Sequence, residues 1–374
     1  MAGASTSDTP AAAPARPSWL ARSPLLRRQL QRFRRIRRGY WSTLALALLL
    51  LLSAGAELLV NSRALVVHHD GEWLFPTYGE FIPGTRFGFE YDYETNYRAL
   101  AQRIADDDAA RASRGEAPSG DFVLLPPVPW SPYETDYVEG SYPPYPPSSA
   151  HWLGTDTTGR DVLARLFYGF RTAMLFSIAL LLCTYLIGVS VGCAMGYFGG
   201  ALDLIGQRLI EVWSNIPFLY VIMIIASIVV PSFGTLVLMM VLFGWMGMTW
   251  YMRTSTYREK ARDYVLAARA LGAGPVRVIF RHILPNTLSL IVTFVPFSIA
   301  GGITALTALD YLGFGLPPPT PSWGELLAQG TANLDSPWIV GSVVLAMSAV
   351  LLMVTFIGEA VREAFDPRKY SHYE

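Results

Sequence analysis

Long apolar stretches recur along this chain, separated by polar segments of very different lengths. Six of them lie at about residues 40–60, 172–197, 209–230, 235–252, 287–312 and 338–361. A helix needs roughly 20 apolar residues to cross the ~30 Å hydrocarbon core of a bilayer, and only the fourth stretch is near the lower limit. The pattern predicts an all-α polytopic membrane protein with six transmembrane helices and an external insert between helices 1 and 2.

Basic residues orient these predicted helices. Seven arginines lie within the thirteen residues immediately before the first apolar stretch: Arg27, Arg28, Arg32, Arg34, Arg35, Arg37 and Arg38. A basic flank before an apolar run is also the form of a signal peptide, but this run is longer than a typical h-region, and no small-residue cleavage pattern clearly follows it. The positive-inside rule therefore places the N-terminus in the cytoplasm, and six crossings return the C-terminus there.

The loop at 253–286 follows the same rule, since it holds seven lysines and arginines against two acidic residues. Loop charge and helix count thus agree on the topology. The predicted parts are a basic cytoplasmic tail (1–39), transmembrane helix 1 (40–60), a periplasmic insert with an interfacial helix (61–171), a five-helix core (172–361) with cytoplasmic loops at about 199–208 and 253–286, and a cytoplasmic tail (362–374).

Composition agrees with a membrane protein but hides how the residues are segregated. Of 374 residues, 52% are hydrophobic, the mean hydropathy is +0.32 and the formal net charge is zero. Cys183 and Cys193 lie about 15 Å apart on one predicted helix, too far for a disulfide, so we expect buried thiols. The five histidines show no metal-ligand spacing, and the pair His68-His69 lacks a third partner, so we expect no metal site.

The predicted external insert is acidic and aromatic. Residues 62–151 carry fourteen acidic side chains against six arginines, with many tyrosines, prolines and tryptophans. A disordered acidic linker is the alternative, but such a linker rarely contains so many aromatic residues. We therefore expect short strands and turns that form a small external cap, with a solvated excursion at 106–120.

The polar loop before the fifth stretch predicts a rigid elbow. Apolar or small residues recur at Tyr264, Ala267, Ala268 and Leu271, the i, i+3, i+4, i+7 pattern of a helix with one contact face, and Asp263 is placed to cap it. Gly272 then supplies a stop, and a second helix at about 275–283 ends at Pro285. Such an elbow could dock on a soluble partner; an ordinary loop lying on the membrane interface is the alternative.

This loop, YVLAARALGA followed by RHILPN, resembles the "EAA" loop of permease subunits of ABC importers, in particular the C-type subunit of the oligopeptide, dipeptide and nickel family. The resemblance implies a type I importer permease fold. It also implies that the loop couples to an ATPase through Tyr264, Ala267, Ala268, Arg269, Gly272 and Pro285. Leu266 stands where the family usually has glutamate, so the contact should depend on shape more than on charge.

Two other segments resemble the same family. Residues 152–165 read WLGTDTTGRDVLAR, which predicts a turn and an amphipathic interfacial helix; cation or phosphate binding is the less favoured alternative. Residues 312–325 read LGFGLPPPTPSWGE, whose glycines and prolines end a helix on the outer side. A structural loop is favoured there over a contact with the solute or its carrier. The residues with a possible structural or gating role are Arg208, Glu211, Pro217, Gly315, Pro318 and Trp323.

The external insert contains, in order, the segments DGEWLFP, FGFEYDYETNYRALAQRI, LLPPVPWSPYETDYVEG and PPYPPSSAHWLGTD. In these segments it resembles the insert of the YejE-type permeases of microcin C and oligopeptide importers. The resemblance implies an inner-membrane subunit that forms half of a translocation path for peptides or peptide-like solutes or, more narrowly, for solutes of the microcin C type. The implied partners are a second homologous permease in a heterodimer, two ABC ATPase subunits or one fused ATPase, a periplasmic solute-binding protein and the lipid membrane, with no nucleic acid.

Two other function classes fit the residues less well. The chain contains no G-x-x-x-x-G-K-[ST] phosphate loop, so ATP and magnesium should bind to partner ATPases and no cofactor to this chain. A secondary transporter would show internal repeats and midplane ion ligands, and a membrane enzyme would show convergent catalytic residues; neither pattern stands out. We therefore predict that the chain is a multi-pass transporter subunit of a bacterial inner membrane and that it is not an enzyme. The solute stays open.

Overall fold

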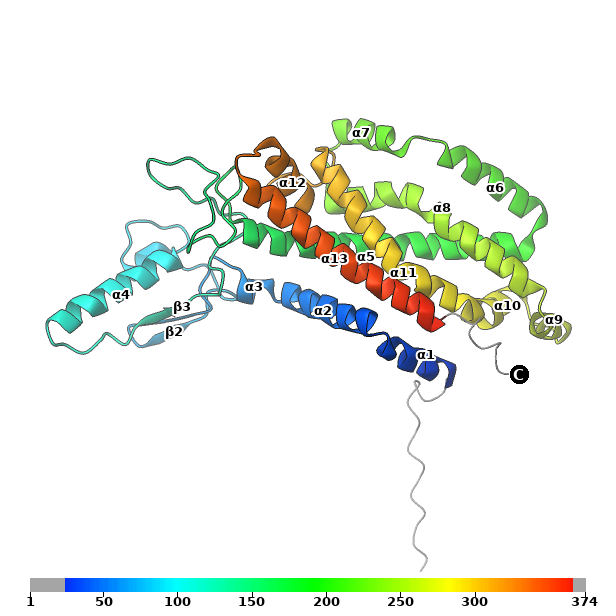
Figure 1. Cartoon of the computed structure of the whole chain (residues 1–374), viewed down its shortest axis with the longest axis horizontal. Helices are drawn as coiled ribbons and strands as arrows, with labels where there is room; N and C mark the ends of the chain where they lie inside the picture. The colour runs from blue at the N-terminus through cyan, green and yellow to red at the C-terminus, as the bar shows by residue number, and fades with distance from the viewer. Residues whose placement is uncertain (1–23, 366–374) are drawn as a thin grey trace, which may run out of the picture.

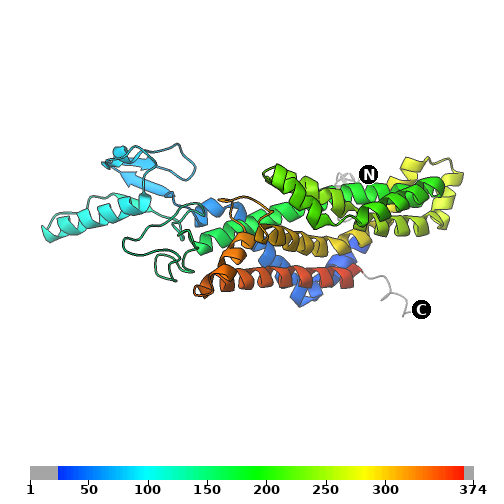
Figure 2. The same ribbon diagram turned by 90° about the horizontal axis from the view of Figure 1, so that it is seen from above.

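The structure is a computed structural model that describes residues 24–365. Its long helices lie side by side along one axis, and the predicted external insert forms a smaller domain beyond one end of them (Figure 1). We call this domain the external domain and this end the outer end, after their predicted side, and the opposite end the inner end. The view from above shows the same elongated arrangement (Figure 2). The four longest helices are α5 (Val162–Phe198), α8 (Phe233–Lys260), α11 (Leu284–Tyr311) and α13 (Pro337–Phe365).

Four helical runs are long and apolar enough to cross a membrane: α5, α8, α13 and the run Pro275–Tyr311, which contains α11. A fifth crossing exists if α6 (Gly200–Ser214) and α7 (Phe218–Ile228) form one bent span. These runs confirm the predicted polytopic helical fold. The predicted first span corresponds to α2 (Arg37–Ala54), which begins with two arginines and is not among these runs. The count of six therefore stays a prediction.

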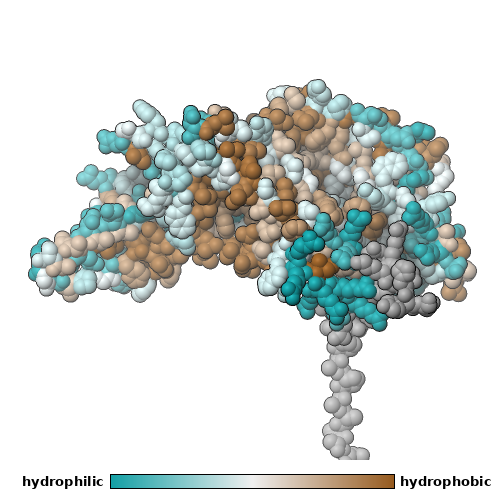
Figure 3. All heavy atoms as spheres, viewed as in Figure 1, coloured by the Kyte–Doolittle hydropathy of each residue, from teal (hydrophilic) through white to brown (hydrophobic). Residues whose placement is uncertain are grey.

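The N-terminal helices lie against the last one. α1 (Pro24–Arg35) is followed by α2 and by the short α3 (Ala56–Leu59), and α2 packs along α13. A side-chain carbon at Gly39 would lie 2.1 Å from Cβ of Ala360, so the glycine lets the two helices meet. Figure 3 shows a hydrophobic surface between the hydrophilic α1 and the mixed surface of the external domain.

The third predicted span is broken, and the cytoplasmic loop predicted at 199–208 is helical instead. The chain turns at Gly199 and Gly200, which have φ of 66° and 59°, and α6 begins at once. α6 and α7 meet at 68° around Asn215 and Pro217. Proline lacks an amide donor and disfavours helical geometry in the residue before it, which explains the bend.

The second predicted span is longer than expected. A separate interfacial helix was predicted before residue 172, whereas α5 runs unbroken from Val162. Val162 and Ala164 are fully buried, so the first turns of α5 lie under the external loops. Asp161 caps the helix, since its Oδ1 accepts a 2.7 Å hydrogen bond from the amide of Ala164.

The external domain contains the predicted short strands. β1 (Val66–His69) pairs antiparallel with β2 (Glu72–Leu74) on one side and with β3 (Phe122–Leu124) on the other. The 3₁₀ turn η2 (Gly84–Phe87) and α4 (Tyr97–Ser113) complete a small core. The excursion expected at 106–120 is helical as far as Ser113, since an alanine-rich helix capped by Asn96 extends into it.

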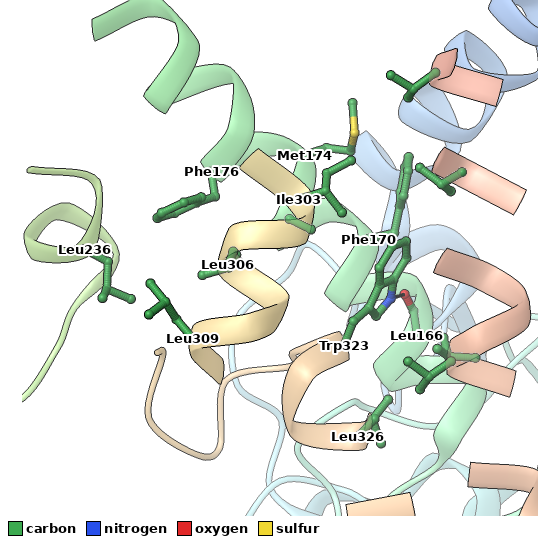
Figure 4. Close-up of a cluster of buried hydrophobic side chains, with 14 of the residues drawn as sticks. Leu166, Phe170, Met174, Phe176, Leu236, Ile303, Leu306, Leu309, Trp323 and Leu326 are labelled. Atoms are coloured by element: carbon green, nitrogen blue, oxygen red, sulfur yellow. Dashed lines mark hydrogen bonds between the residues drawn. The ribbon is translucent and has the colours of Figure 1, made fainter. Parts of the chain in front are cut away.

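The main core lies at the outer half of the bundle, where α5, α11, α13 and α12 (Trp323–Ala332) meet (Figure 4). Only a turn was predicted before the last span, and α12 was not predicted. Trp323 inserts beside Phe170, and its Nε1 donates to the carbonyl of Leu166 at 2.9 Å. Of the two cysteines, Cys193 is buried as expected, but Cys183 is exposed.

Candidate functional site

The predicted docking helix is α9 (Asp263–Ala270), at the inner end of the bundle after α8 (Figure 1). Tyr264, Ala267 and Arg269 are exposed on it, whereas Ala268 is buried with Val265. Both alanines were predicted to lie on one contact face. The buried side chain of Val265, however, turns one side of this short helix toward the protein, and Ala268 lies on that side. Of these two alanines, Ala267 is therefore the one open to a partner.

The start of α9 also differs from the prediction. Arg262, not Asp263, is the N-cap residue, and no side chain caps this end. The Asp263 carboxylate lies in the first turn, where the helix dipole still favours a negative charge. The Tyr264 hydroxyl donates a 2.5 Å hydrogen bond to Oε2 of Glu259 in α8. Burial and the nearby Glu259 charge raise the pKa of Tyr264 to about 12, so the phenol stays neutral and joins α9 to α8.

The elbow turns at Gly272 and then continues into the membrane. Gly272 has φ of 85°, in the left-handed region that favours glycine, and open space surrounds its Cα. After it, α10 (Pro275–Val278), the π-helical turn η3 (Ile279–Ile283) and α11 form one helical run. The second helix therefore does not end at Pro285. That proline lies in the first turn of α11, after the wider π turn.

A small apolar cluster joins the elbow to the bundle. Val265, Val278 and Ile283 are fully buried, and Tyr197 at the inner end of α5 packs with them. Because the cluster contains residues of α9, α10 and the π turn, the elbow is attached to both α5 and α11. A displacement of α9 would therefore reach two transmembrane helices.

The inner charges form simple ion pairs. Arg208 and Glu211 are exposed and lie 2.5 Å apart, one turn apart on α6. A second pair was not predicted: Arg253 of α8 donates from Nε and Nη2 to the two Asp203 oxygens at 2.5 and 2.7 Å. Asp203 and Arg253 were predicted to lie in two separate cytoplasmic loops. Both lie near the ends of predicted spans, and such charges could have suggested that they form an ion pair.

A cavity of about 310 Å³ lies between α5, α8 and α11 within the apolar part of the bundle. Tyr185 and Ser298 line it, and their side-chain oxygens lie 2.7 Å apart. Thr184 also lines it, together with several glycines. Polar side chains and small residues thus line a cavity within the apolar part of the bundle.

Buried charges tie the outer end together. Arg160 donates to Asp156 and to Glu325, each at 2.8 Å, and Arg165 contacts Glu325 with Nη2. Arg165 and Asp156 are fully buried, and Arg165 Nε lies 3.4 Å from an Asp156 oxygen without a hydrogen bond. The charged groups of the 152–165 motif thus neutralise Glu325 of the 312–325 motif. This geometry argues against the cation or phosphate alternative.

His151 links the external loops to the same helix end. Its Nδ1 lies 2.8 Å from Asp161 and its Nε2 lies 3.2 Å from Asp136, and the ring packs on Trp130. Burial alone would lower the pKa of His151, but the hydrogen bonds and charges of the two aspartates outweigh it and raise that pKa. Both ring nitrogens face carboxylates, so the protonated ring satisfies both of them.

The loop after α11 is held by one carboxylate. Asp310 accepts hydrogen bonds from the amide of Leu316 at 2.7 Å and from the hydroxyl of Ser322 at 2.5 Å. A side-chain carbon at Gly315 would collide with Asp310, which explains that glycine. Pro318 lies in the same loop, before a cis peptide bond to Pro319. These contacts support the structural role considered for Gly315, and Trp323 lies in the core (Figure 4).

A larger cavity, which we call the outer cavity, has a volume of about 700 Å³. It is lined by α3, α5 and the loops at 131–133, 231–233 and 316–321. At one side Arg171 donates to Glu57 at 2.8 Å. Neither residue was predicted as a site residue, although a charge at the outer end of a predicted span is a recognisable signal of a functional position.

Within residues 24–365, one group of side chains has the composition of a metal site: His69, Asp70 and Asp121 in the external domain. His69 Nδ1 hydrogen bonds to Asp121 at 2.8 Å, and Asp70 is almost fully exposed on the turn between β1 and β2. Tertiary structure thus brings Asp121 beside His69, but His68 is not in the group, and the hydrogen bond by itself accounts for the arrangement.

Comparison with known proteins adds to this geometry. Residues 186–370 match the family described as "Binding-protein-dependent transport system inner membrane component". The "Inner membrane ABC transporter permease protein YejE" of Escherichia coli is 42% identical over 93% of this chain and 98% of its own length. The "Peptidoglycan transport system permease protein YejE" of Agrobacterium fabrum is 40% identical over 93% and 94%. The "Dipeptide transport system permease protein DppC" of Bacillus subtilis is 33% identical over 60% and 70%.

Proposed function

This chain belongs to the inner-membrane permease components of binding-protein-dependent ABC transport systems, and from that premise we propose that it forms half of the translocation path of an importer for peptides or peptide-like solutes. The transport functions for which the relatives are named, peptidoglycan transport in one and dipeptide transport in another, support this solute class. A solute of the microcin C type is a narrower version of the same proposal.

One observation carries the mechanism. The helical run Pro275–Tyr311 begins at the elbow on the inner end and reaches Asp310, which holds the outer loop. The mid-bundle cavity lies beside this run, since Ser298 lines it. A partner that pushes α9 would tilt this run beside the cavity while Asp310 holds its outer end, as alternating access requires.

The proposal includes partners that bind elsewhere. Two ABC ATPase subunits, or one fused ATPase, would dock at α9 in the cytoplasm and would hold ATP and magnesium, so this chain would bind no cofactor. A second homologous permease would complete the path as a heterodimer, and a periplasmic binding protein would deliver the solute. The basic N-terminal flank and the loop at 253–286 support cytoplasmic termini in an inner membrane.

The test is to reconstitute the chain in liposomes with the ATPases and second permease encoded beside it, together with the binding protein. We expect ATP-dependent uptake of a labelled tripeptide. Ala267→Trp places a bulky ring on the exposed face of α9 and should weaken ATPase association by about 10-fold or more. Ala112→Trp, at an exposed position of α4, is the matched control. If Ala267→Trp leaves ATPase association and uptake intact, the docking role is wrong.

A further inference from the structure

We propose that the outer cavity receives the charged ends of a short peptide, with Arg171 binding its terminal carboxylate and Glu57 its terminal ammonium group. The proposal rests on the function proposed above and assigns a recognition step to it. Arg171 is on α5 and Glu57 on α3, so the two charges stand on separate helices at the mouth of the bundle.

The cavity has the size and position for this role. Its volume of about 700 Å³ falls within the roughly 300–1,000 Å³ of small-molecule pockets. It lies at the outer end, where the external domain and the loop after α11 meet the helices (Figure 1). A solute released outside the membrane would therefore meet it before the mid-bundle cavity.

The ion pair is accessible and open to exchange. The Arg171 and Glu57 side chains keep 37% and 34% of their surface exposed. Arg171 uses Nη1 for Glu57, and its Nε and Nη2 make no hydrogen bond to any residue of the described chain. An arginine with unused donors can bind a carboxylate through two parallel hydrogen bonds, whereas an exposed ion pair has little stability of its own. A zwitterion can thus take the place of the pair by satisfying both charges.

The remaining walls favour a ligand with variable side chains. Tyr133, Tyr168, Pro132, Pro317 and Pro321 present rings to the cavity. The Tyr168 hydroxyl donates to the carbonyl of Val60 at 3.1 Å and is already occupied. Ring faces contact many side chains without selecting one. Recognition would therefore come from the peptide ends, which all peptides share.

The buried charges behind the cavity keep these walls in place. Arg165 Nη1 donates to the carbonyl of Pro132 at 3.1 Å and to that of Pro319 at 3.4 Å. One guanidinium thus joins the loops at 131–133 and 316–321, which both line the cavity. A binding cavity between loops needs such support, because loops alone hold geometry poorly.

The experiment uses the complete importer in liposomes with one fixed binding protein, so that differences between variants come from the permease. The probes are trialanine with free ends, N-acetyl-trialanine, trialanine amide and the doubly blocked peptide. With Arg171→Gln, the KM for free trialanine should rise by about 10-fold through loss of a charge-assisted contact, with kcat unchanged. The KM for trialanine amide should not change. Glu57→Gln should show the mirror pattern with N-acetyl-trialanine.

Two further variants separate recognition from a purely structural link between α3 and α5. Arg63→Gln removes a matched ion pair, since Arg63 and Glu94 lie 2.7 Å apart, are 33% and 29% exposed, and lie in the external domain. It should leave all four KM values unchanged. The double variant Glu57→Arg/Arg171→Glu keeps an ion pair but exchanges its charges, and it should still raise the KM for free trialanine.

The outcomes are distinct. Two outcomes would show that the ion pair is only a structural link: Arg171→Gln reduces the uptake of all four probes equally, or the charge-exchanged variant has normal KM values. Either outcome would overturn this inference but leave the proposed function standing. Unchanged KM values in Arg171→Gln would do the same. If the wild-type importer takes up none of the probes, the proposed peptide function fails, and this inference fails with it.

Discussion

The Arg165 network at the outer end and the Arg208–Glu211 pair at the inner end hold their charges in opposite ways. At the outer end, Arg165 and Asp156 are fully buried and share partners with Arg160 and Glu325. At the inner end, Arg208 and Glu211 are exposed, and the elbow is attached through a small apolar cluster. The loops joined by Arg165 are thus built to stay in one arrangement, whereas the elbow can be moved at low energetic cost.

This difference has a physical basis. Buried charges require their partners in one geometry, since an uncompensated charge in a low-dielectric interior is very unfavourable. Exposed ion pairs are replaced by water with little change in free energy. A lever that a partner must push belongs at the second kind of end, and loops that surround a receiving cavity belong at the first.

The largest effect is expected from the buried network. Glu325→Ala leaves Arg160 and Arg165 without their shared carboxylate and should lower the free energy of unfolding by about 3–5 kcal/mol. Thermal and denaturant unfolding in detergent would measure it. Glu359→Ala, an exposed position on α13, is the control. A loss below about 1 kcal/mol would mean that the outer charges behave like a surface pair, and the contrast between the ends would disappear.

A smaller effect is expected at the elbow. Gly272→Val puts a branched side chain at φ of 85°, which should cost about 1–2 kcal/mol of local strain although no atom lies close enough to collide. We expect near-normal folding but a loss of coupling between ATP hydrolysis and uptake. Gly274→Ala is the control, since Gly274 has an ordinary φ of −70°. Equal coupling in both variants would show that the conformation of Gly272 does not matter.

The pH dependence at His151 should be smaller still. Because the folded-state pKa is raised, its protonated ring contributes stability that is complete below the unfolded pKa of about 6.5 and is lost as pH rises through the higher folded value. The unfolding midpoint should therefore fall from mildly acidic to alkaline pH, and His151→Gln should flatten that part of the profile. A wild-type profile that is flat, or that rises with pH, would contradict the assigned ion pairs.

The smallest effect is expected from the exposed inner pair. Glu211→Ala removes the partner of Arg208 and should change the free energy of unfolding by about 0.5 kcal/mol or less. Chemical unfolding, compared directly with Glu325→Ala, provides the measurement. A loss as large as that of the buried network would show that the inner end is not the softer one.

Much of the fold could be predicted because helix-forming apolar segments are local features. The four membrane-length runs overlap predicted spans, and the glycine stop at Gly272 has the expected conformation. The bounds were less predictable. Residues 199–208 form the start of α6 because Gly199 and Gly200 turn the chain early, a choice that hydropathy does not record.

The candidate sites depended on partners that lie far apart in the sequence. Arg165 and Glu325 are separated by 160 residues, and Glu57 and Arg171 by 114. The motifs around Arg165 and Glu325 were recognised as two separate turns, and only packing shows that they neutralise each other. On α9, Ala268 is buried and Ala267 is exposed because Val265 packs into a cluster with residues of other helices. That packing, too, depends on residues that lie elsewhere in the sequence.

By itself, the sequence determined which segments suit the membrane and which flank is basic, because the free energy of placing a residue in hydrocarbon or beside a charged surface depends mainly on that residue and its neighbours. Only the tertiary structure decided which charges are paired, which alanine faces a partner and where a cavity remains. Those properties depend on distances between distant parts of the chain, since Coulomb attraction, desolvation and packing act through space.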